Sequence, residues 1–350
     1  MLHGLAILAK EEIAGYSSAV RRFHRSDFEL DSWIRGTKMK SAQVEAVNGV
    51  RTFAEVRELA RTKGPKRVGV VYADDEVALT AATEAMRSEI ASPVLIGEEK
   101  GIRARAESLG FTDLAAKAEF VPAAENAAEL AVKMAREGDI DILMKGHLRT
   151  DQLLHPVLDK EKGLRTGRLL CDIAFFEHHG PDGTRLVGIG DGGLNPAPTL
   201  AQKKQIVLSA IELLGAMGIR RPKIAIMSAV EVVSEAIPST MDAKVLTEMG
   251  AAGEFGEAEV FGPLALDNAL LEWAARIKGI TSPVAGHADC LIVPSVEAGN
   301  MLSKAINFLI GCEFGHVVVG AKVPILIPSR VERAEDKINA MALGVLYASR

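Results

Sequence analysis

The sequence predicts an α/β protein whose mostly parallel sheet is covered by helices on both faces. From residue 67 onward, short apolar segments typical of buried strands alternate with longer segments that have the spacing of amphipathic helices. Several of the strands are followed by loops rich in glycine, proline and polar residues. Strands that alternate with helices along a chain form parallel sheets, and such sheets need helices on both faces.

The first predicted elements lie between residues 68 and 144. Asp74 and Asp75 follow the first strand and can cap the next helix, because their carboxylates accept hydrogen bonds from its free N–H groups. Val77, Ala78 and Ala81 then share one face of that helix. The predicted order is a strand at 68–72, a helix to about residue 90, a strand at 93–96, a helix at 125–137 and a strand at 140–144.

The middle of the chain predicts an antiparallel hairpin, so we expect a mixed sheet there. Strands at 172–176 and 185–189 flank residues 181–184, whose Pro-Asp-Gly-Thr sequence is typical of a turn. The later elements are helices at 199–217, 239–249, 266–277, 298–310 and 332–347, and strands at 223–227, 290–293, 316–319 and 323–327.

Residues 1–40 differ from the rest of the chain. Charged residues crowd this stretch, and its apolar residues show weak periodicity. We expect an N-terminal extension that is not required by the core, followed by a helix at 42–61.

Composition argues against several classes of protein. Acidic and basic residues are interspersed at a net charge of −5, and no block of like charge indicates a nucleic-acid partner. No apolar run is long enough to span a membrane. The three cysteines show no Cys-x-x-Cys spacing, which favours reduced, buried thiols in a cytoplasmic protein. The sequence contains no cluster of Cys and His residues that would predict a metal site.

Three loops carry residues suited to chemistry. Lys145, His147 and Arg149 precede a predicted helix start, where cations and free N–H groups bind phosphate. Residues 188–199 are rich in glycine but lack both nucleotide-binding spacings. Ser329 and Arg330 follow an apolar strand, where Arg330 can bind phosphate through two hydrogen bonds.

Each loop also has a purely structural interpretation. Thr150 and Thr199 can each cap a helix at the end of an ordinary solvated or tight loop. Ser329 and Glu332 have the spacing of a capping box, so Ser329 can simply cap the last helix.

Six motifs together resemble the phosphate acetyl/butyryltransferase family, most closely its short butyryltransferase-like branch. They occur in the family's order and cover residues 65–350. The matching segments are residues 145–151, 191–199, 267–268, 282–289, 297–301 and 320–330.

The resemblance implies a two-lobed, three-layer α/β/α fold with mostly parallel sheets, like that of isocitrate and isopropylmalate dehydrogenases. The first lobe would comprise residues 41–150 and 305–350, and the second residues 151–304. It also implies a homodimer without a metal or other cofactor. Acyl-CoA, CoA and phosphate or acyl phosphate would be its substrates, with an acetyl or butyryl group transferred between CoA and phosphate.

The family's catalytic Ser-Arg pair falls on Ser329 and Arg330. A catalytic aspartate falls on Asp336, whereas short-branch members carry the acid at the position of Glu332. We favour Asp336 as the base, because a capping box can hold Glu332. The substrate-binding residues implied by the motifs are Lys145, His147, Arg149, Thr150, Asn195 and Asn300. An arginine that acetyltransferases carry after the first loop is replaced by His155, so its phosphate contact is either lost or taken over by Arg149.

Two other classes stay open. A metal- and NAD-dependent dehydrogenase can share the two-lobed fold, although we cannot assemble its ligand set from the sequence. A non-catalytic CoA-binding protein is the second alternative.

Overall fold

The computed structural model describes residues 49–350 except 124 and 181–182. Its strands are β1 (Lys66–Val71), β2 (Ala91–Gly97), β3 (Glu119–Pro122), β4 (Ile142–Lys145), β5 (Cys171–Gly180), β6 (Gly183–Gly190), β7 (Lys223–Met227), β8 (Glu259–Leu264), β9 (Cys290–Ile292), β10 (Phe314–Val319) and β11 (Ile325–Leu326). They form one sheet in the order β3-β2-β1-β4-β11-β10-β5-β6-β9-β7-β8.

The sheet is parallel at both ends and antiparallel in the middle. Parallel pairings join β3, β2, β1, β4 and β11, and also β6, β9, β7 and β8. Antiparallel pairings join β11 to β10, β10 to β5 and β5 to β6. The predicted α/β class with a mostly parallel sheet is confirmed, and so is the predicted β5–β6 hairpin.

Helices α3 to α8 belong to the part of the chain that supplies β1 to β4. They are α3 (Phe53–Thr62), α4 (Glu76–Arg87), α5 (Glu99–Ser108), α6 (Thr112–Lys117), α7 (Ala127–Glu137) and α8 (Thr150–Val157). The Asp75 side chain accepts a hydrogen bond from the Ala78 N–H at 2.9 Å, so the predicted cap of α4 is confirmed.

The later helices are α9 (Leu200–Ala216), α10 (Pro238–Ala251), α11 (Leu266–Leu270), α12 (Glu272–Ile277), α13 (Val296–Lys304) and the π-helix η1 (Ala305–Ile310). Thr199 and Gln202 form a capping box at the start of α9, which confirms Thr199 as its N-cap. The single helix predicted at 266–277 is wrong, because Leu271 adopts an extended conformation and divides it into α11 and α12.

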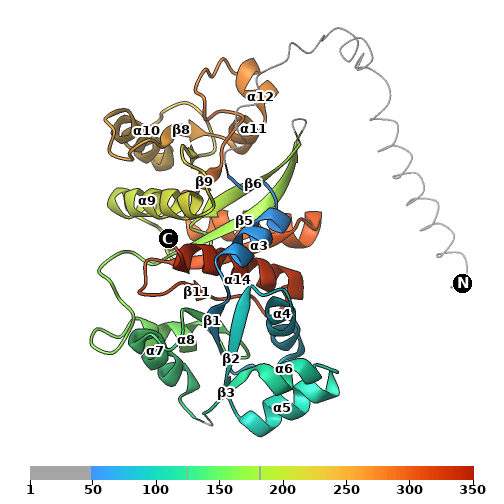
Figure 1. Cartoon of the computed structure of the whole chain (residues 1–350). Helices are drawn as coiled ribbons and strands as arrows, with labels where there is room; N and C mark the ends of the chain where they lie inside the picture. The colour runs from blue at the N-terminus through green and yellow to red at the C-terminus, as the bar shows by residue number, and fades with distance from the viewer. Residues whose placement is uncertain (1–48, 124, 181–182) are drawn as a thin grey trace, which may run out of the picture. The chain divides into compact units, whose positions relative to one another are not determined.

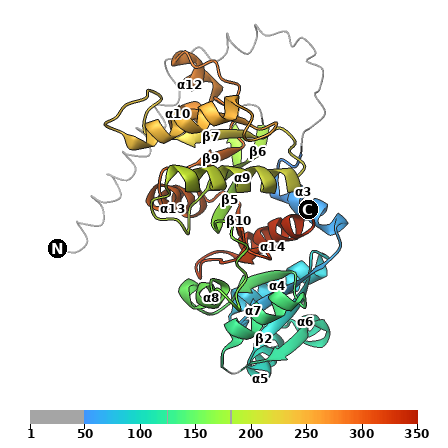
Figure 2. The same ribbon diagram turned by 90° about the vertical axis from the view of Figure 1, so that its left-hand side faces the viewer.

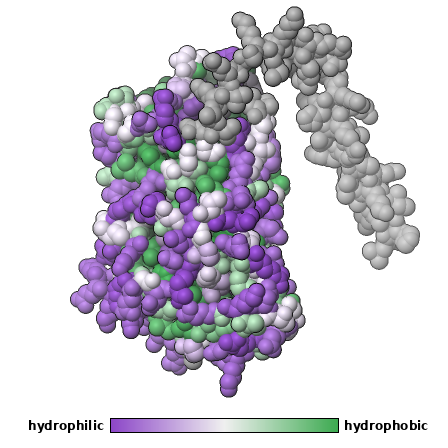
Figure 3. Space-filling view, viewed as in Figure 1, coloured by the Kyte–Doolittle hydropathy of each residue, from purple (hydrophilic) through white to green (hydrophobic). Residues whose placement is uncertain are grey.

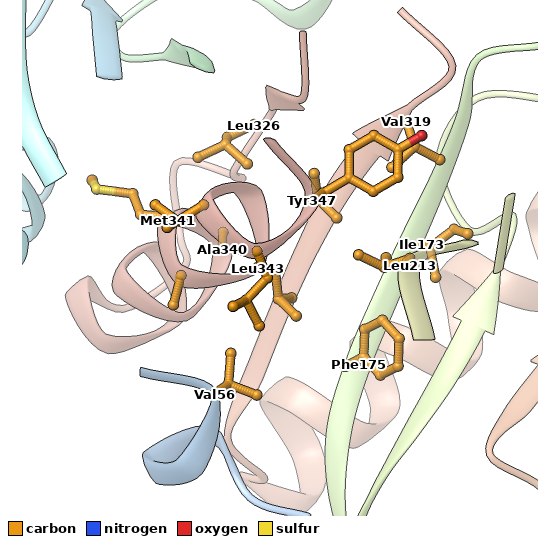
Figure 4. Packing of buried hydrophobic residues seen from close by; sticks show 14 of the residues in the cluster. Val56, Ile173, Phe175, Leu213, Val319, Leu326, Ala340, Met341, Leu343 and Tyr347 are labelled. Atoms are coloured by element: carbon orange, nitrogen blue, oxygen red, sulfur yellow. The ribbon is translucent and has the colours of Figure 1, made fainter. Parts of the chain in front are cut away.

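The last helix, α14 (Ala334–Ala348), joins the beginning of the described chain to the central strands. In Figures 1 and 2, α14 lies between α4 and α9, and it also contacts α3 and β10. Figure 4 shows its Leu343 and Tyr347 facing Val56, Ile173 and Phe175. All five side chains are buried, so this helix fixes β10, β11 and the loop before it against the rest of the core.

Several elements were not predicted from the sequence: β3, β8, α5 and α6. The helix start expected after Lys145, His147 and Arg149 is confirmed as α8, but its N-cap is Arg149, so Thr150 does not cap it. β3 and α6 are short, and α5 carries many charged residues, so none of the three shows a clear apolar periodicity. The expected extension at 1–40 and residues 42–48 of the helix expected at 42–61 lie outside the described residues. Within the described part, the predicted start is wrong, because Thr52 is the N-cap and α3 begins at Phe53.

Hydrophilic areas predominate on the face shown in Figure 3, with smaller apolar areas among them. Among the helices of the described residues, none combines the length and the apolar character needed to cross a bilayer.

Candidate active site

A cavity of about 270 Å³ lies against the central antiparallel strands. Asp172 and Ala174 of β5 line it together with Phe314 and His316 of β10. Asp172 pairs with Val318, and His316 pairs with Ala174. Directly opposed residues of an antiparallel pair point to the same face, and so do residues two apart in one strand. The register therefore places Asp172 and His316 on one face of the sheet.

The polar rim of the cavity comes from loops that follow four different strands. Thr150 follows β4, Gly192 and Gly193 follow β6, Asn300 lies beyond β9, and Ser329 and Glu332 follow β11. Three antiparallel pairings separate β11 from β6, so the two strands run in opposite directions. Their loops consequently reach the cavity from opposite sides of the central strands.

Ser329 and Glu332 form a turn ahead of α14. The Ser329 N–H donates to the Glu332 carboxylate at 3.0 Å, and the Glu332 N–H donates to the Ser329 carbonyl at 3.2 Å. Because α14 begins only at Ala334 with Arg333 as its N-cap, the prediction that the helix begins at residue 332 is wrong, and Ser329 does not cap it. The Ser329 side chain instead lines the cavity.

Glu332 and Asp336 have different surroundings. Glu332 lines the cavity and is 8% exposed. Asp336 is fully buried, and it accepts hydrogen bonds from Arg333 Nε at 3.1 Å, Arg333 Nη2 at 2.9 Å and Asn307 Nδ2 at 3.4 Å. The Asp336 carboxylate is thus engaged in hydrogen bonds with Arg333 and Asn307, and Asp336 does not line the cavity.

The structure does not bring the basic residues of the first loop together in the cavity. His147 faces Asp74 at 3.3 Å and Arg149 pairs with Asp151 at 2.9 Å, and both basic side chains are exposed. Lys145 is 5% exposed, and burial lowers the pKa of its amine. Thr150 is the member of this loop that lines the cavity.

Arg330 is exposed, and no hydrogen bond or ion pair joins it to the other described residues. Its positive charge nevertheless contributes to the lowered pKa of Lys145, after the larger effect of burial.

Asn195, in the loop after β6, and Asn300, in α13, belong to the segments on the other side of the cavity. Asn195 donates to the Leu170 carbonyl at 2.9 Å and to the Asp191 carboxylate, which also accepts the Gly193 N–H at 2.7 Å. Asn195 thus braces the glycine-rich loop, whereas Asn300 lines the cavity. A Cβ on Gly193 would lie 2.4 Å from Asp172 Oδ2, so glycine is required for this approach.

The sequence did not predict that Asp172, His316 and Lys337 belong to this region. His316 is the single histidine in the apolar strand β10, a signal that could have drawn attention to it. Lys337 lies in the first turns of α14, is 3% exposed and faces Asp75 at 3.8 Å.

The predicted buried thiols are confirmed for Cys171 and Cys290, whereas Cys312 is partly exposed. Burial raises the pKa of Cys171 to about 12. A thiol with so high a pKa is a poor nucleophile near neutral pH. Among the described residues, no group of three His, Cys, Asp or Glu side chains is arranged to hold a metal ion.

The chain is similar to known proteins over most of its length. Residues 115–345 match the family described as "Phosphate acetyl/butaryl transferase". The phosphate acetyltransferase of Rhizobium meliloti is 41% identical over 83% of this chain and 92% of its own length. The phosphate butyryltransferase of Clostridium acetobutylicum is 36% identical over 85% of this chain and 99% of its own. A branched-chain phosphotransacylase structure from Enterococcus faecalis superimposes with a TM-score of 0.71 at 28% identity, covering 81% of this chain and 99% of that one.

The fold and the cavity define an α/β protein with a charged, polar pocket suited to a small anionic substrate. The chain belongs to the phosphate acetyl/butyryltransferase family, because the match covers most of its length and the relatives align over nearly their whole length.

Proposed function

We propose that the protein transfers a short acyl group reversibly between coenzyme A and inorganic phosphate, in the cavity next to Ser329. One observation carries the proposal beyond family membership. Residues from four separate motif segments line a single cavity, namely Thr150, Gly192, Asn300 and Ser329. Convergence of distant segments on one pocket is typical of an active site.

The reaction needs a proton acceptor and groups that stabilise negative charge. In the direction of acyl-CoA synthesis, the CoA sulfur attacks the acyl carbon, the carbon–oxygen bond to phosphate breaks, and the thiol proton must leave. A thiol pKa of about 8.5 leaves most of it protonated at neutral pH, so a nearby carboxylate accelerates attack. We propose Glu332 for this role in place of Asp336, because Glu332 lines the cavity and Arg333 occupies Asp336.

The developing oxyanion and the phosphate are both negative. The Ser329 hydroxyl can donate a hydrogen bond within the cavity, and Arg330 and Lys145 supply positive charge beside it. We propose that Arg330 binds the phosphate, since its planar guanidinium can make two hydrogen bonds to it. His147 and Arg149 are exposed and paired with Asp74 and Asp151, so a phosphate role for either would require its release.

The experiment that tests this function is thiol release from acetyl-, propionyl- and butyryl-CoA, with and without phosphate and without added metal or nicotinamide. We expect release from at least one substrate only when phosphate is present, and no loss of rate with a chelator. NADH turnover would instead support a dehydrogenase. CoA binding without turnover would support a non-catalytic protein.

We also propose that the protein forms a homodimer. Met301, Leu309 and Ile310 on α13 and η1 are 66%, 85% and 71% exposed, and apolar side chains gathered on one surface are typical of an interface. Light scattering should give the mass of two chains, and Leu309→Glu should shift it toward one. A wild-type mass of one chain at micromolar concentration would contradict the dimer.

A cytoplasmic location stays a proposal drawn from the cysteines, which form no disulfide among the described residues. Cell fractionation would test it.

A further inference from the structure

A buried histidine separates two carboxylates in the cavity. His316 Nδ1 lies 2.9 Å from Asp172 Oδ1, within hydrogen-bonding distance, while His316 Nε2 lies 3.6 Å from Glu332 Oε2. The three residues are 7%, 6% and 8% exposed. They come from β10, β5 and the turn after β11, so the fold brings them together from distant parts of the chain.

The two atoms that face each other have no hydrogen-bond partner. His316 Nε2 and Glu332 Oε2 are both buried and unpaired among the described residues. Such atoms are rare in native structures because each loses its interaction with water. The other Glu332 oxygen is held by the Ser329 N–H at 3.0 Å, so Oε2 is the oxygen that faces His316 at 3.6 Å.

The charges of these groups depend on one another. Burial alone would lower the pKa of His316, but Asp172 and Glu332 raise it well above 6.5, so the ring is an imidazolium at neutral pH. Burial alone would raise the pKa of Glu332, but the attraction of His316 lowers it below its ordinary value of 4.5. Glu332 consequently stays ionised in a site that would otherwise favour its protonated form.

We propose that His316, fixed by Asp172, is a positioning residue that keeps Glu332 ionised and directed into the cavity. The inference rests on the proposed function, in which Glu332 accepts the proton of the CoA thiol. As the carbon–sulfur bond forms and the carbon–oxygen bond to phosphate breaks, that proton moves to Glu332 Oε2 and then to the departing phosphate oxygen. The carboxylate is restored, and His316 keeps its own proton throughout.

Other charged groups surround the pair, and each affects its titration. Lys337 of α14 lowers the pKa of Glu332, and Lys145 of β4 interacts with the same carboxylate. Arg330 and Asp75 act on Lys145, and Lys304 of α13 lines the cavity. Burial raises the pKa of Asp191, and the nearby charge of Asp172 raises it further. His316 differs from these groups because its ring nitrogen Nε2 faces Glu332 Oε2.

The test is the pH dependence of kcat/KM in His316→Gln. An active carboxylate is lost as the pH falls through its pKa, so a higher Glu332 pKa moves the acidic limb of the profile to higher pH. We expect the acidic limb to move by at least one pH unit, with the largest loss at the acidic end of the profile and substantial recovery at pH 8.5. A loss of equal size at every pH would overturn the proposal.

Three further variants keep the result interpretable. His179→Gln removes an exposed histidine of β5 outside the cavity and should leave the profile unchanged. Asp172→Asn retains an acceptor for His316 Nδ1 and should shift the acidic limb of the profile in the same direction by a smaller amount. It supplies the test if His316→Gln fails to fold. His316→Gln added to Glu332→Gln should cause little additional loss, because His316 acts through Glu332.

Two failures can be told apart. Wild-type protein without phosphate-dependent acyl transfer would refute the proposed function itself. An active wild type combined with an unshifted profile in both the His316 and Asp172 variants, or with additive losses in the double variant, would refute only the role of His316.

Discussion

Glu332 and Asp336 lie four positions apart, and their neighbours give them different tasks. Glu332 belongs to the cavity lining; one of its oxygens faces His316 Nε2 at 3.6 Å, and the Ser329 N–H holds the other. Asp336 accepts hydrogen bonds from Arg333 and Asn307 and is fully buried. Residue type and spacing make either acid a plausible base, and only the three-dimensional surroundings distinguish them.

Glu332→Gln should lower kcat by about 10²- to 10⁴-fold with little change in stability, because the thiol loses its proton acceptor. Asp336→Asn should lower the free energy of unfolding by about 1–3 kcal/mol, because Arg333 loses its charged partner, while kcat stays close to wild type. Steady-state kinetics and thermal unfolding of both variants check this. The reverse pattern would return the base to Asp336.

Ser329→Ala separates a catalytic role from a structural one. The hydroxyl lines the cavity and α14 begins five residues later, so its removal should leave the unfolding temperature almost unchanged. If it donates to the oxyanion, kcat should fall by about 10²-fold or more. An unchanged kcat accompanied by a stability loss of about 1 kcal/mol, the usual cost of removing a cap, would restore the structural interpretation.

At the scale of secondary structure, the sequence predicted the elements with clear periodicity and missed those without it. The strand at Lys66–Val71 and the helix capped by Asp75 follow from apolar spacing and cap chemistry. The start of α14 was placed two residues early, because the Ser329 and Glu332 spacing fits a capping box and also fits the turn observed. Sequence spacing does not distinguish the two, since both use the same hydrogen bond.

The packing of α14 is the interaction on which the catalytic turn depends. Leu343 is fully buried among residues from distant parts of the chain (Figure 4). Leu343→Ala should cost about 2–5 kcal/mol of unfolding free energy through lost contacts and a cavity. Ile277→Ala, at a side chain that is 78% exposed, should stay within about 0.5 kcal/mol. Chemical denaturation measures both, and equal effects would argue against this account of the core.

At the scale of the whole molecule, the sequence motifs identified segments around the cavity, but not the residues of the central strands that line it. Thr150, Asn300 and Ser329 were expected and line the cavity, whereas Asp172 and His316 were not. Their meeting depends on the β5–β10 pairing, which joins residues 144 positions apart. His147 and Arg149 were expected at the substrate, but Asp74 and Asp151 pair with them. Such local pairings cannot be read from a single sequence.

Removing residues 1–38 should leave kcat/KM and the unfolding temperature nearly unchanged. The described strands form one sheet, and the residues that line the cavity all lie between 150 and 332. Kinetics and thermal unfolding of the shortened chain check this. Insoluble or inactive protein would show that the core requires the N-terminal extension.

The central claim is that acyl transfer to phosphate occurs in this cavity, and the coupling between its two products tests it most directly. Acyl-CoA and phosphate are incubated with the enzyme while thiol is titrated and acyl phosphate is followed by phosphorus NMR. The account predicts one acyl phosphate for each thiol released, and loss of both products together in Glu332→Gln. Thiol release without acyl phosphate would identify a thioesterase and contradict the account.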